Sequence, residues 1–285
     1  MLITDTAEVG ELSAETFMRF AQFITGELGI KMPESKLTMV HSRLLRRVRE
    51  LKLNSVEQYS EYFFTSSNSQ EREHFINAIT TNKTDFFREA EHFDFLTRIA
   101  LPSLSRTASY RPGSRLKVWS AGCSSGEEPY TLAMVLSEYE LEHPGFDFAI
   151  LGTDVSTRVL DLARDGIYQE SQTAPVPPEL RRKYLRQGHH QSQCLARVVP
   201  ELRQKVTFHQ LNFMAEDYGI RDMFDLVFFR NVLIYFDKPT QEAVINKISR
   251  NLRPGGYFFA GHSESLTGLN TALSCVQTAV FRKLV

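Results

Sequence analysis

Residues 116–130 read LKVWSAGCSSGEEPY, an apolar run followed by a loop of small residues and then by two glutamates and a proline. The run at 116–121 is typical of a buried strand, and Pro129 fits the first turn of a helix, where its missing N–H costs nothing. A strand, a small-residue loop and a helix in this order predict the first unit of an open α/β sheet. In such sheets, ligands bind at the carboxyl ends of the strands.

Alternating strands and helices continue toward the C-terminus. Further strands are predicted at 148–153, 206–211, 224–229 and 257–260. With a helix at 239–252, the pattern predicts a parallel, doubly wound sheet over 91–285, in which 275–284 is a last strand pairing antiparallel at the edge. Residues from about 169 to 203 break the alternation and predict a small, hairpin-like β-subdomain inserted between sheet elements.

The first ninety residues have a different pattern. Apolar residues recur at helical spacing within 17–28, 37–51, 56–64 and 70–79. We therefore expect an all-α domain over 1–90. One side of the helix at 37–51 carries the densest positive patch of the chain, formed by Arg43, Arg46, Arg47 and Arg49. Such a patch either docks an acidic partner or is a solvated charged face.

Composition excludes several classes of protein. A formal net charge of −1 over 285 residues argues against bulk attraction to nucleic acid. Three scattered cysteines are too few for a disulfide framework or a zinc site, and they fit a reducing cytosol. The first residues lack the basic and apolar regions of a signal peptide, and no run of about 18 apolar residues is long enough to span a membrane. We expect a cytoplasmic protein with no membrane-inserted segment and no metal site.

Polar residues stand where the predicted strands end. Glu127 and Glu128 begin a helix, where carboxylates would repel the pyrophosphate of a dinucleotide. They suit a ligand with a cationic amino group, such as the methionine part of S-adenosylmethionine, or they only complement the helix dipole. Asp154 ends the second strand, in position to accept hydrogen bonds from ribose hydroxyls. The later strands are followed by Asn212, Arg230 and Asn231.

Four longer stretches are more specific. They read NKTDFFRE at 82–89, SAGCSSGEEPY at 120–130, RNVLIYFD at 230–237 and AGHSE at 260–264. They resemble signatures of the CheR chemoreceptor methyltransferases, in the order in which that family carries them. The resemblance implies an all-α N-terminal domain followed by a Rossmann-like methyltransferase domain that carries an antiparallel β-subdomain.

The resemblance also implies an activity and the residues that perform it. A CheR enzyme transfers the methyl group of S-adenosylmethionine to glutamate side chains of methyl-accepting chemotaxis receptors, forming glutamyl methyl esters and S-adenosylhomocysteine. The implied cofactor-binding residues are Asn82, Thr84, Arg88, Glu128, Asp154, Asn212, Phe213, Arg230 and Asn231. Glu127 is the alternative to Glu128. Arg88 and Tyr235 are expected near the reacting atoms, whereas His262 is interpreted as structural.

The expected partner is the helical cytoplasmic domain of chemoreceptors, and we expect a monomer that is recruited to membrane receptor arrays. Receptor methylation regions are rich in glutamate, so the arginines of 37–51 are the expected docking face. In some members of the family the β-subdomain binds a peptide at the receptor's C-terminus. Here Gly188-His189-His190 replaces the usual Gly-x-Gly turn, so the sequence does not decide whether this chain binds such a peptide.

Two other classes of protein share parts of this pattern. A protein that binds S-adenosylmethionine and only docks on receptors would keep the cofactor residues. The presence of Arg88 and Tyr235, the residues expected near the reacting atoms, argues against this alternative. A nucleic acid methyltransferase would place the positive patch on RNA or DNA, but such enzymes more often carry a net positive charge.

The chemistry of the CheR reaction also fits the residues present. An ionised glutamate acceptor needs no strong general base, which agrees with a site that has no obvious catalytic histidine.

Overall fold

The computed structural model describes residues 12–65, 69–106, 114–190 and 193–284. The chain divides into two compact units, Met1–Thr81 and Asn82–Val285. The expected boundary at residue 90 therefore moves to 81–82. Phe86 explains the shift, because it is buried in the hydrophobic core of the second unit with its ring 4.9 Å from that of Tyr168.

Helices build the described part of the first unit, in agreement with the sequence. They are α1 (Ala14–Leu28), η1 (Glu34–Lys36), α2 (Leu37–Glu50), α3 (Val56–Thr65) and α4 (Ser69–Ile79). Gly29 ends α1 in the left-handed conformation, with a φ of 68°. The rings of Phe20, Phe63 and Phe75 lie in the core of this unit, with centroids 4.7 Å apart for Phe63–Phe75 and 5.2 Å for Phe20–Phe75.

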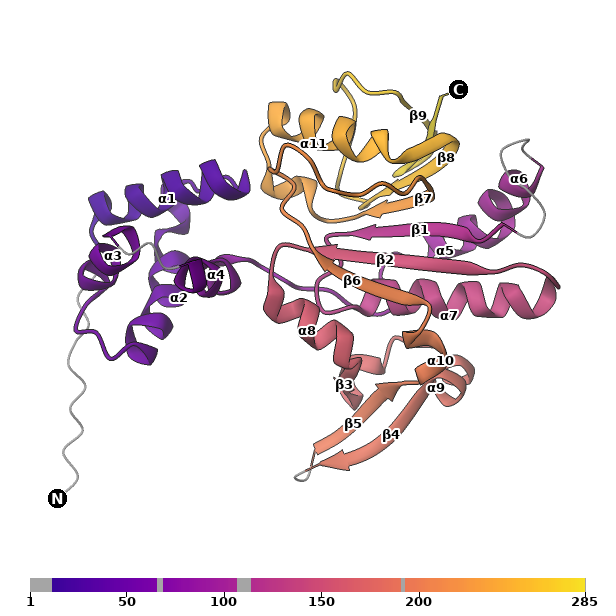
Figure 1. Cartoon of the computed structure of the whole chain (residues 1–285), viewed down its shortest axis with the longest axis horizontal. Coiled ribbons are helices and arrows are strands. Elements are labelled where there is room, and N and C mark those ends of the chain that lie inside the picture. The colour runs from indigo at the N-terminus through magenta and orange to yellow at the C-terminus, as the bar shows by residue number, and fades with distance from the viewer. Residues whose placement is uncertain (1–11, 66–68, 107–113, 191–192, 285) are drawn as a thin grey trace. The chain divides into compact units, whose positions relative to one another are not determined.

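A sheet of seven described strands forms the second unit, in the order β6-β2-β1-β7-β8-β10-β9 (Figure 1). The parallel strands are β1 (Leu116–Ala121), β2 (Phe148–Asp154), β6 (Val206–Gln210), β7 (Phe224–Phe229) and β8 (Leu252–Ala260). Chain order reverses between β1 and β7, and ligands bind at such a switch point in open α/β sheets. The predicted doubly wound fold is confirmed.

One strand prediction at the C-terminus is wrong. The segment 275–284 does not form one strand but parts of two, β9 (Leu273–Gln277) and β10 (Val280–Lys283), which pair antiparallel. The two residues between them turn the chain back, and Ala279 adopts a φ of +58°. The turn lacks glycine, proline and asparagine, the residues that usually mark a turn.

Helices and short helical turns flank this sheet. They are α5 (Glu91–Phe95), η2 (Leu96–Ala100), α6 (Leu101–Ser105), α7 (Glu127–Glu142), α8 (Thr157–Asp165), η4 (Leu233–Tyr235) and α11 (Lys238–Arg250). Phe228 and Phe259 stack at 4.2 Å, and Phe93 of α5 lies parallel to Phe228 at 6.2 Å. Phe229, the next residue of β7, points to the opposite face and meets Phe213 at 4.9 Å.

The predicted β-subdomain is a second, antiparallel sheet. Its strands lie in the order β3 (Ile167–Gln169), β5 (Gln193–Val198), β4 (Leu185–His190). Three short helical segments accompany it, η3 (Glu170–Thr173), α9 (Pro178–Tyr184) and α10 (Pro200–Arg203). Residues 188–190 lie within β4 rather than in a turn, and the connection at 191–192 lies outside the described residues.

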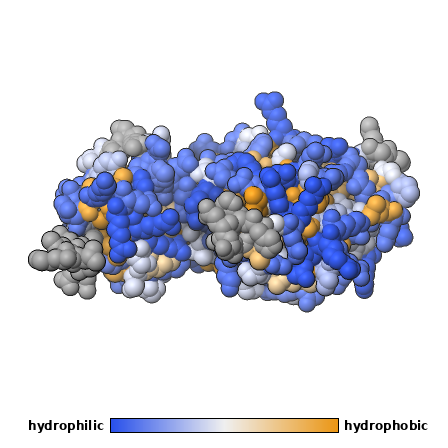
Figure 2. Space-filling view, turned by 90° about the horizontal axis from the view of Figure 1, so that it is seen from below, coloured by the Kyte–Doolittle hydropathy of each residue, from blue (hydrophilic) through white to orange (hydrophobic). Residues whose placement is uncertain are grey.

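The surface shown in Figure 2 is mostly hydrophilic, and its apolar residues form scattered small patches. Within the described ranges, no helix has both the length and the apolar character needed to cross a membrane.

Candidate functional site

The loop after β1 is held in a tightly bent conformation. Gly122 and Gly126 have φ values of +77° and +96°, which favour glycine. A Cβ on Gly122 would lie 2.6 Å from a methyl group of Val232, in the segment that follows β7. The ends of β1 and β7 are therefore in close contact, at the switch point of the sheet.

Asp154 connects this loop to the end of β2. Its buried carboxylate accepts hydrogen bonds from the amides of Ser124, at 2.9 Å, and Ser156, at 3.0 Å. Burial raises the pKa of Asp154, and the backbone hydrogen bonds oppose that rise. Because each carboxylate oxygen has two acceptor sites, the group retains capacity for the hydroxyl donors of a ligand.

Two adjacent glutamates at the start of α7 have different surroundings. Glu127 is buried and accepts a hydrogen bond from Ser125 Oγ at 2.7 Å, and burial raises its pKa to about 7. Glu128 instead accepts from Ser120 Oγ at 2.7 Å and from Arg230 Nη1 at 3.1 Å. Burial raises the pKa of Glu128, and the charge of Arg230 opposes this. Glu128 thus joins the row of strand-end residues.

Arg230 is the centre of an ion-pair network. Its side chain is 2% exposed and contacts Glu128 as well as Glu89, whose Oε2 lies 3.0 Å from Nη2 and 3.2 Å from Nε. Arg230 also donates to the carbonyl of Arg88. Burial alone would raise the pKa of Glu89, but Arg230 and the amide of His262 hold it below its ordinary value. The network ties the end of β7 to α7 and to the segment 82–89.

Asn231 continues the network toward β8. It adopts a φ of +60°, and its amide donates to Glu264 Oε2 at 2.8 Å. The amide of Gly261 donates to the same oxygen at 2.6 Å. A Cβ on Gly261 would lie 2.5 Å from Asn231 Nδ2, so these two segments pack in close contact.

The sequence reasoning assigned no role to Glu89 or Glu264. Both carboxylates lie among the polar residues at the strand ends. Glu89 accepts hydrogen bonds from Arg230 and Asn231, and Glu264 accepts one from the amide of Asn231. A signal was present, because Glu89 ends the stretch NKTDFFRE and Glu264 ends AGHSE.

The segment 82–89 lies against the glycine loop. Ser124 Oγ donates to the carbonyl of Asn82 at 2.8 Å, and the amide of Phe87 donates to Thr131 Oγ1 at 3.1 Å. Thr84 and Arg88 are half-buried. The guanidinium of Arg88 has a weak contact, at 3.5 Å, with the carbonyl of Lys83.

The remaining predicted site residues follow β6 and β7. Asn212 Oδ1 accepts from the amide of Met214 at 2.9 Å, and Phe213 packs against Tyr218 and Phe229. Tyr235 ends η4 and is half-buried. These residues stand on segments that leave the same edge of the sheet as Asp154 and Arg230.

In the first unit, the four arginines of α2 do not form one free patch. Arg47 is 13% exposed and makes a two-pronged ion pair with buried Glu71, at 2.8 and 2.6 Å. Arg43 donates to the carbonyl of Ile79 and, at 2.9 Å, to Thr81 Oγ1. Arg46 and Arg49 are exposed, and Arg46 pairs with Glu50 on the same helix at 3.0 Å. Arg47 therefore stabilises the helical unit, which differs from its predicted role in docking.

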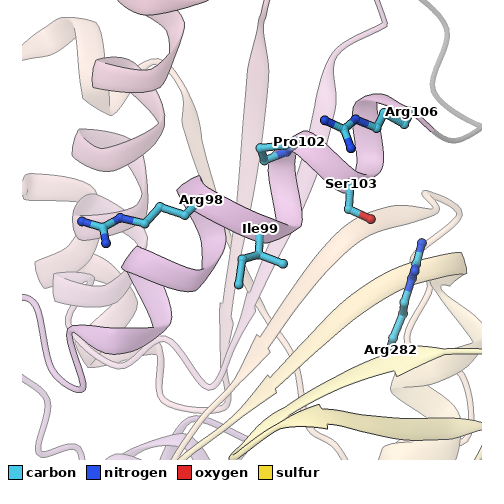
Figure 3. A pocket seen from close by; sticks show the side chains of 6 residues that line it. All are labelled: Arg98, Ile99, Pro102, Ser103, Arg106 and Arg282. Carbon is cyan, nitrogen blue, oxygen red and sulfur yellow. The ribbon is translucent and has the colours of Figure 1, made fainter.

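Figure 3 shows a different pocket, of about 450 Å³, on the second unit. Residues of η2, α6 and β10 line it together with Arg106, which follows α6, and none of them is a predicted cofactor-binding or catalytic residue. They are Arg98, Ile99, Pro102, Ser103, Arg106 and Arg282.

The comparisons with known proteins decide the family. The family model "CheR methyltransferase, SAM binding domain" matches residues 82–282, and "CheR methyltransferase, all-alpha domain" matches residues 15–80. The chain belongs to the CheR methyltransferase family. The resemblance read from the four sequence stretches is thereby confirmed, and so is S-adenosylmethionine as the cofactor.

Curated CheR relatives match almost the whole chain. It is 36% identical to a chemotaxis protein methyltransferase of Borreliella burgdorferi, over 95% of each chain. It is 40% identical to chemotaxis protein methyltransferase 2 of Pseudomonas aeruginosa, over 94% of this chain and 92% of that protein. For the chemotaxis protein methyltransferase of Escherichia coli the identity is 38%, over 94% and 90%. This CheR protein is an S-adenosylmethionine-dependent chemotaxis methyltransferase.

The strand-end residues of this CheR protein fit a cationic cofactor. The carboxylates are Glu89, Glu127, Glu128, Asp154 and Glu264, whereas the guanidinium groups are Arg88 and Arg230. Carboxyl groups outnumber guanidinium groups here, and burial raises the pKa of Glu127, Glu128, Asp154 and Glu264. Oε1 of Glu264 is buried, and it has no hydrogen-bond partner among the described residues. A sulfonium with an amino group suits such surroundings, because it offers positive charge and donors to unmatched acceptors.

Proposed function

We propose that this CheR protein methylates glutamate side chains in the helical cytoplasmic domain of chemotaxis receptors. The observation that carries the proposal is the network around Arg230, which joins Glu89 and Glu128 at the point where β1, β7 and the segment 82–89 meet. It builds a fixed, mainly acidic site for a cationic methyl donor. The names of the curated relatives support an acceptor in chemotaxis.

A carboxylate acceptor fits the groups present at this site. Glutamate is already ionised at neutral pH, so its transfer reaction needs no strong base. The buried histidine beside the network, His92, is poorly suited to act as one, because burial lowers its pKa to about 4. S-adenosylmethionine, when bound, supplies an electrophilic methyl group. The chain's own contribution is then positioning and the exclusion of water.

The individual roles that we propose are those implied by the family resemblance. Asp154 would hold the ribose, Glu128 the amino group, and Asn212 with Phe213 the adenine side of the cofactor. Arg230 and Asn231 keep the acidic groups in place. Asn82, Thr84 and Arg88 lie on the segment against the glycine loop and would close over the cofactor. Arg88 would hold the incoming carboxylate by charge-assisted hydrogen bonds, and Tyr235 would orient it.

Receptor docking is a separate part of the proposal. Arg46 and Arg49 on α2 are exposed and positively charged, and receptor methylation regions are rich in glutamate. The antiparallel β-subdomain would bind a receptor C-terminal peptide where such a tether operates. We further propose that the protein acts as a monomer in the cytoplasm and is recruited to receptor arrays.

A methyl-transfer assay tests the proposal. The full chain is incubated with a receptor cytoplasmic fragment and radiolabelled S-adenosylmethionine, and the labelled fragment is then treated with mild base. A glutamyl methyl ester releases its label as methanol, whereas N-methyl groups on lysine, arginine or a nucleobase are retained. Cofactor binding without any transfer would favour the alternative of a catalytically idle docking protein.

A further inference from the structure

His92 on α5 has an unusual environment for a histidine. Its side chain is 1% exposed, and among the described residues neither ring nitrogen has a hydrogen-bond partner. A buried polar group without a partner costs about 1–3 kcal/mol, so it calls for a partner such as a bound water or an ion, or for a functional role. The rings of Phe259 and His262 pack against it, at 5.6 and 4.8 Å.

Two further ligand groups converge on this imidazole. Glu89 Oε2 lies 3.6 Å from His92 Nδ1, and one ligand atom from each of Glu89, His92 and His262 lies within 4.8 Å of the other two. Ligand atoms bound tetrahedrally at about 2.0–2.1 Å lie about 3.4 Å apart, and two imidazoles on one ion have centroids about 5 Å apart. The Glu89–His92 distance of 3.6 Å and the His92–His262 centroid distance of 4.8 Å are close to these values, whereas the three ligand atoms, which lie within 4.8 Å of one another, would draw closer together around an ion.

We propose that Glu89, His92 and His262 form a binding site for a divalent transition metal ion such as Zn²⁺. Two imidazoles and a carboxylate favour zinc or a related ion over Mg²⁺ or Ca²⁺, which prefer oxygen ligands. Three protein ligands leave a fourth position open, and exposed His262 gives the ion access from solvent. The sequence predicted no metal site, because His262 stands far from Glu89 and His92 in the chain and only the fold brings it to them.

The same glutamate belongs to the Arg230 network, and this links the metal to the cofactor site. Glu89 Oε2 accepts hydrogen bonds from Arg230, and Oε1 accepts from the His262 amide at 3.2 Å and from Asn231 Nδ2 at 3.4 Å. An ion on Oε2 competes with Arg230, which also holds Glu128. Metal binding therefore weakens S-adenosylmethionine binding, and by linkage the cofactor weakens metal binding equally.

Cobalt absorption tests the site, since Co²⁺ shows visible d–d bands when nitrogen and oxygen ligands replace its water shell. The experiment uses the untagged full chain with Cys194→Ser and Cys275→Ser, because both thiols are exposed and bind Co²⁺ themselves. We expect bands that Zn²⁺ abolishes stoichiometrically. His262→Ala should remove the bands, and Glu89→Gln should weaken binding by at least about tenfold.

His143→Ala is the matched control, since His143 is an exposed histidine on a different part of the unit. It should keep the bands of the parent protein. Absence of bands in the parent protein, or equal bands in His262→Ala and His143→Ala, would overturn the proposal. Calorimetric titration with S-adenosylmethionine in the presence of saturating Zn²⁺ should give weaker binding than in its absence, and equal affinities would refute the link to Arg230.

Discussion

At the scale of single residues, Arg88 differs from the other arginine of the site. Arg230 is fully engaged by two carboxylates, whereas Arg88 is half-buried and its guanidinium has only a 3.5 Å contact to the Lys83 carbonyl among its described hydrogen bonds. Its side chain is therefore suited to bind an incoming carboxylate rather than to stabilise the fold.

Replacing Arg88 tests this role. Arg88→Ala should lower kcat at saturating cofactor by about 10–100-fold, because a hydrogen bond to a charged group contributes about 1.5–3 kcal/mol. Its free energy of unfolding should stay within about 0.5 kcal/mol of the wild type. Arg98→Ala, an exposed arginine on η2, serves as the control. Unchanged turnover in Arg88→Ala, with weaker cofactor binding alone, would show that Arg88 only packs on the cofactor.

Glu127 gives a prediction about pH. Burial raises its pKa from 4.5 to about 7. Between these values the folded chain retains a proton that the unfolded chain has released, so the free energy of unfolding falls as pH rises through this window. Urea unfolding at pH 5, 6 and 7 should show a steeper fall for the wild type than for Glu127→Gln. Parallel pH profiles would contradict the buried environment of Glu127.

At the scale of elements, the Arg230 network joins three segments that are far apart in the chain. Arg230→Ala leaves Glu89 and Glu128 without their cation, so we expect it to lower the free energy of unfolding by about 3–5 kcal/mol. Arg253→Ala is a suitable control, because its pair with Asp225, at 2.7 Å, is at least as close as the Arg230 pairs, but 30% of the arginine side chain is exposed. Equal losses in the two variants, measured by urea unfolding, would argue against a special role for the network.

The helix α2 carries buried and exposed arginines, and we propose docking for the exposed ones only. Arg46→Glu with Arg49→Glu should slow receptor methylation at low salt and leave cofactor affinity unchanged, because exposed charges act on encounter. Arg98→Glu with Arg106→Glu makes the same change of charge elsewhere and should have little effect. Full receptor methylation by the α2 double variant would refute the docking face.

The buried arginine of α2 gives a different expectation. Arg47→Ala should destabilise the first unit, since it leaves the buried carboxylate of Glu71 without its cation.

Helices and strands were predicted correctly where the spacing of apolar residues and the residues at the ends of the segment indicated the same element. The strands at 116–121 and 224–229 and the helix ending at Gly29 appear at their predicted positions. The turn at residues 278–279 was missed, because Thr278 and Ala279 carry no turn signal. The internal role of Arg47 was also missed, because a periodic charge pattern does not reveal that Glu71, on another helix, lies opposite it.

At the scale of the whole molecule, strand order predicts which residues stand at one edge of the sheet but not how their side chains connect. Parallel strands bring Asp154, Arg230 and the glycine loop to one edge, and this follows from strand order alone. The pairing of Glu89 with Arg230 and the enclosure of His92 depend on how 82–95 packs on the sheet. That packing is long-range in sequence, so local patterns carry no information about it.

In the proposed reaction the methyl group is transferred to a glutamate carboxylate oxygen. This transfer is tested most directly by methylating a receptor cytoplasmic fragment with the full chain and mapping the product by tandem mass spectrometry, before and after mild base. The account predicts methyl groups on glutamate side chains, lost on base treatment and strongly reduced with Arg88→Ala. Base-stable methyl groups on lysine, arginine or any other side chain would contradict it.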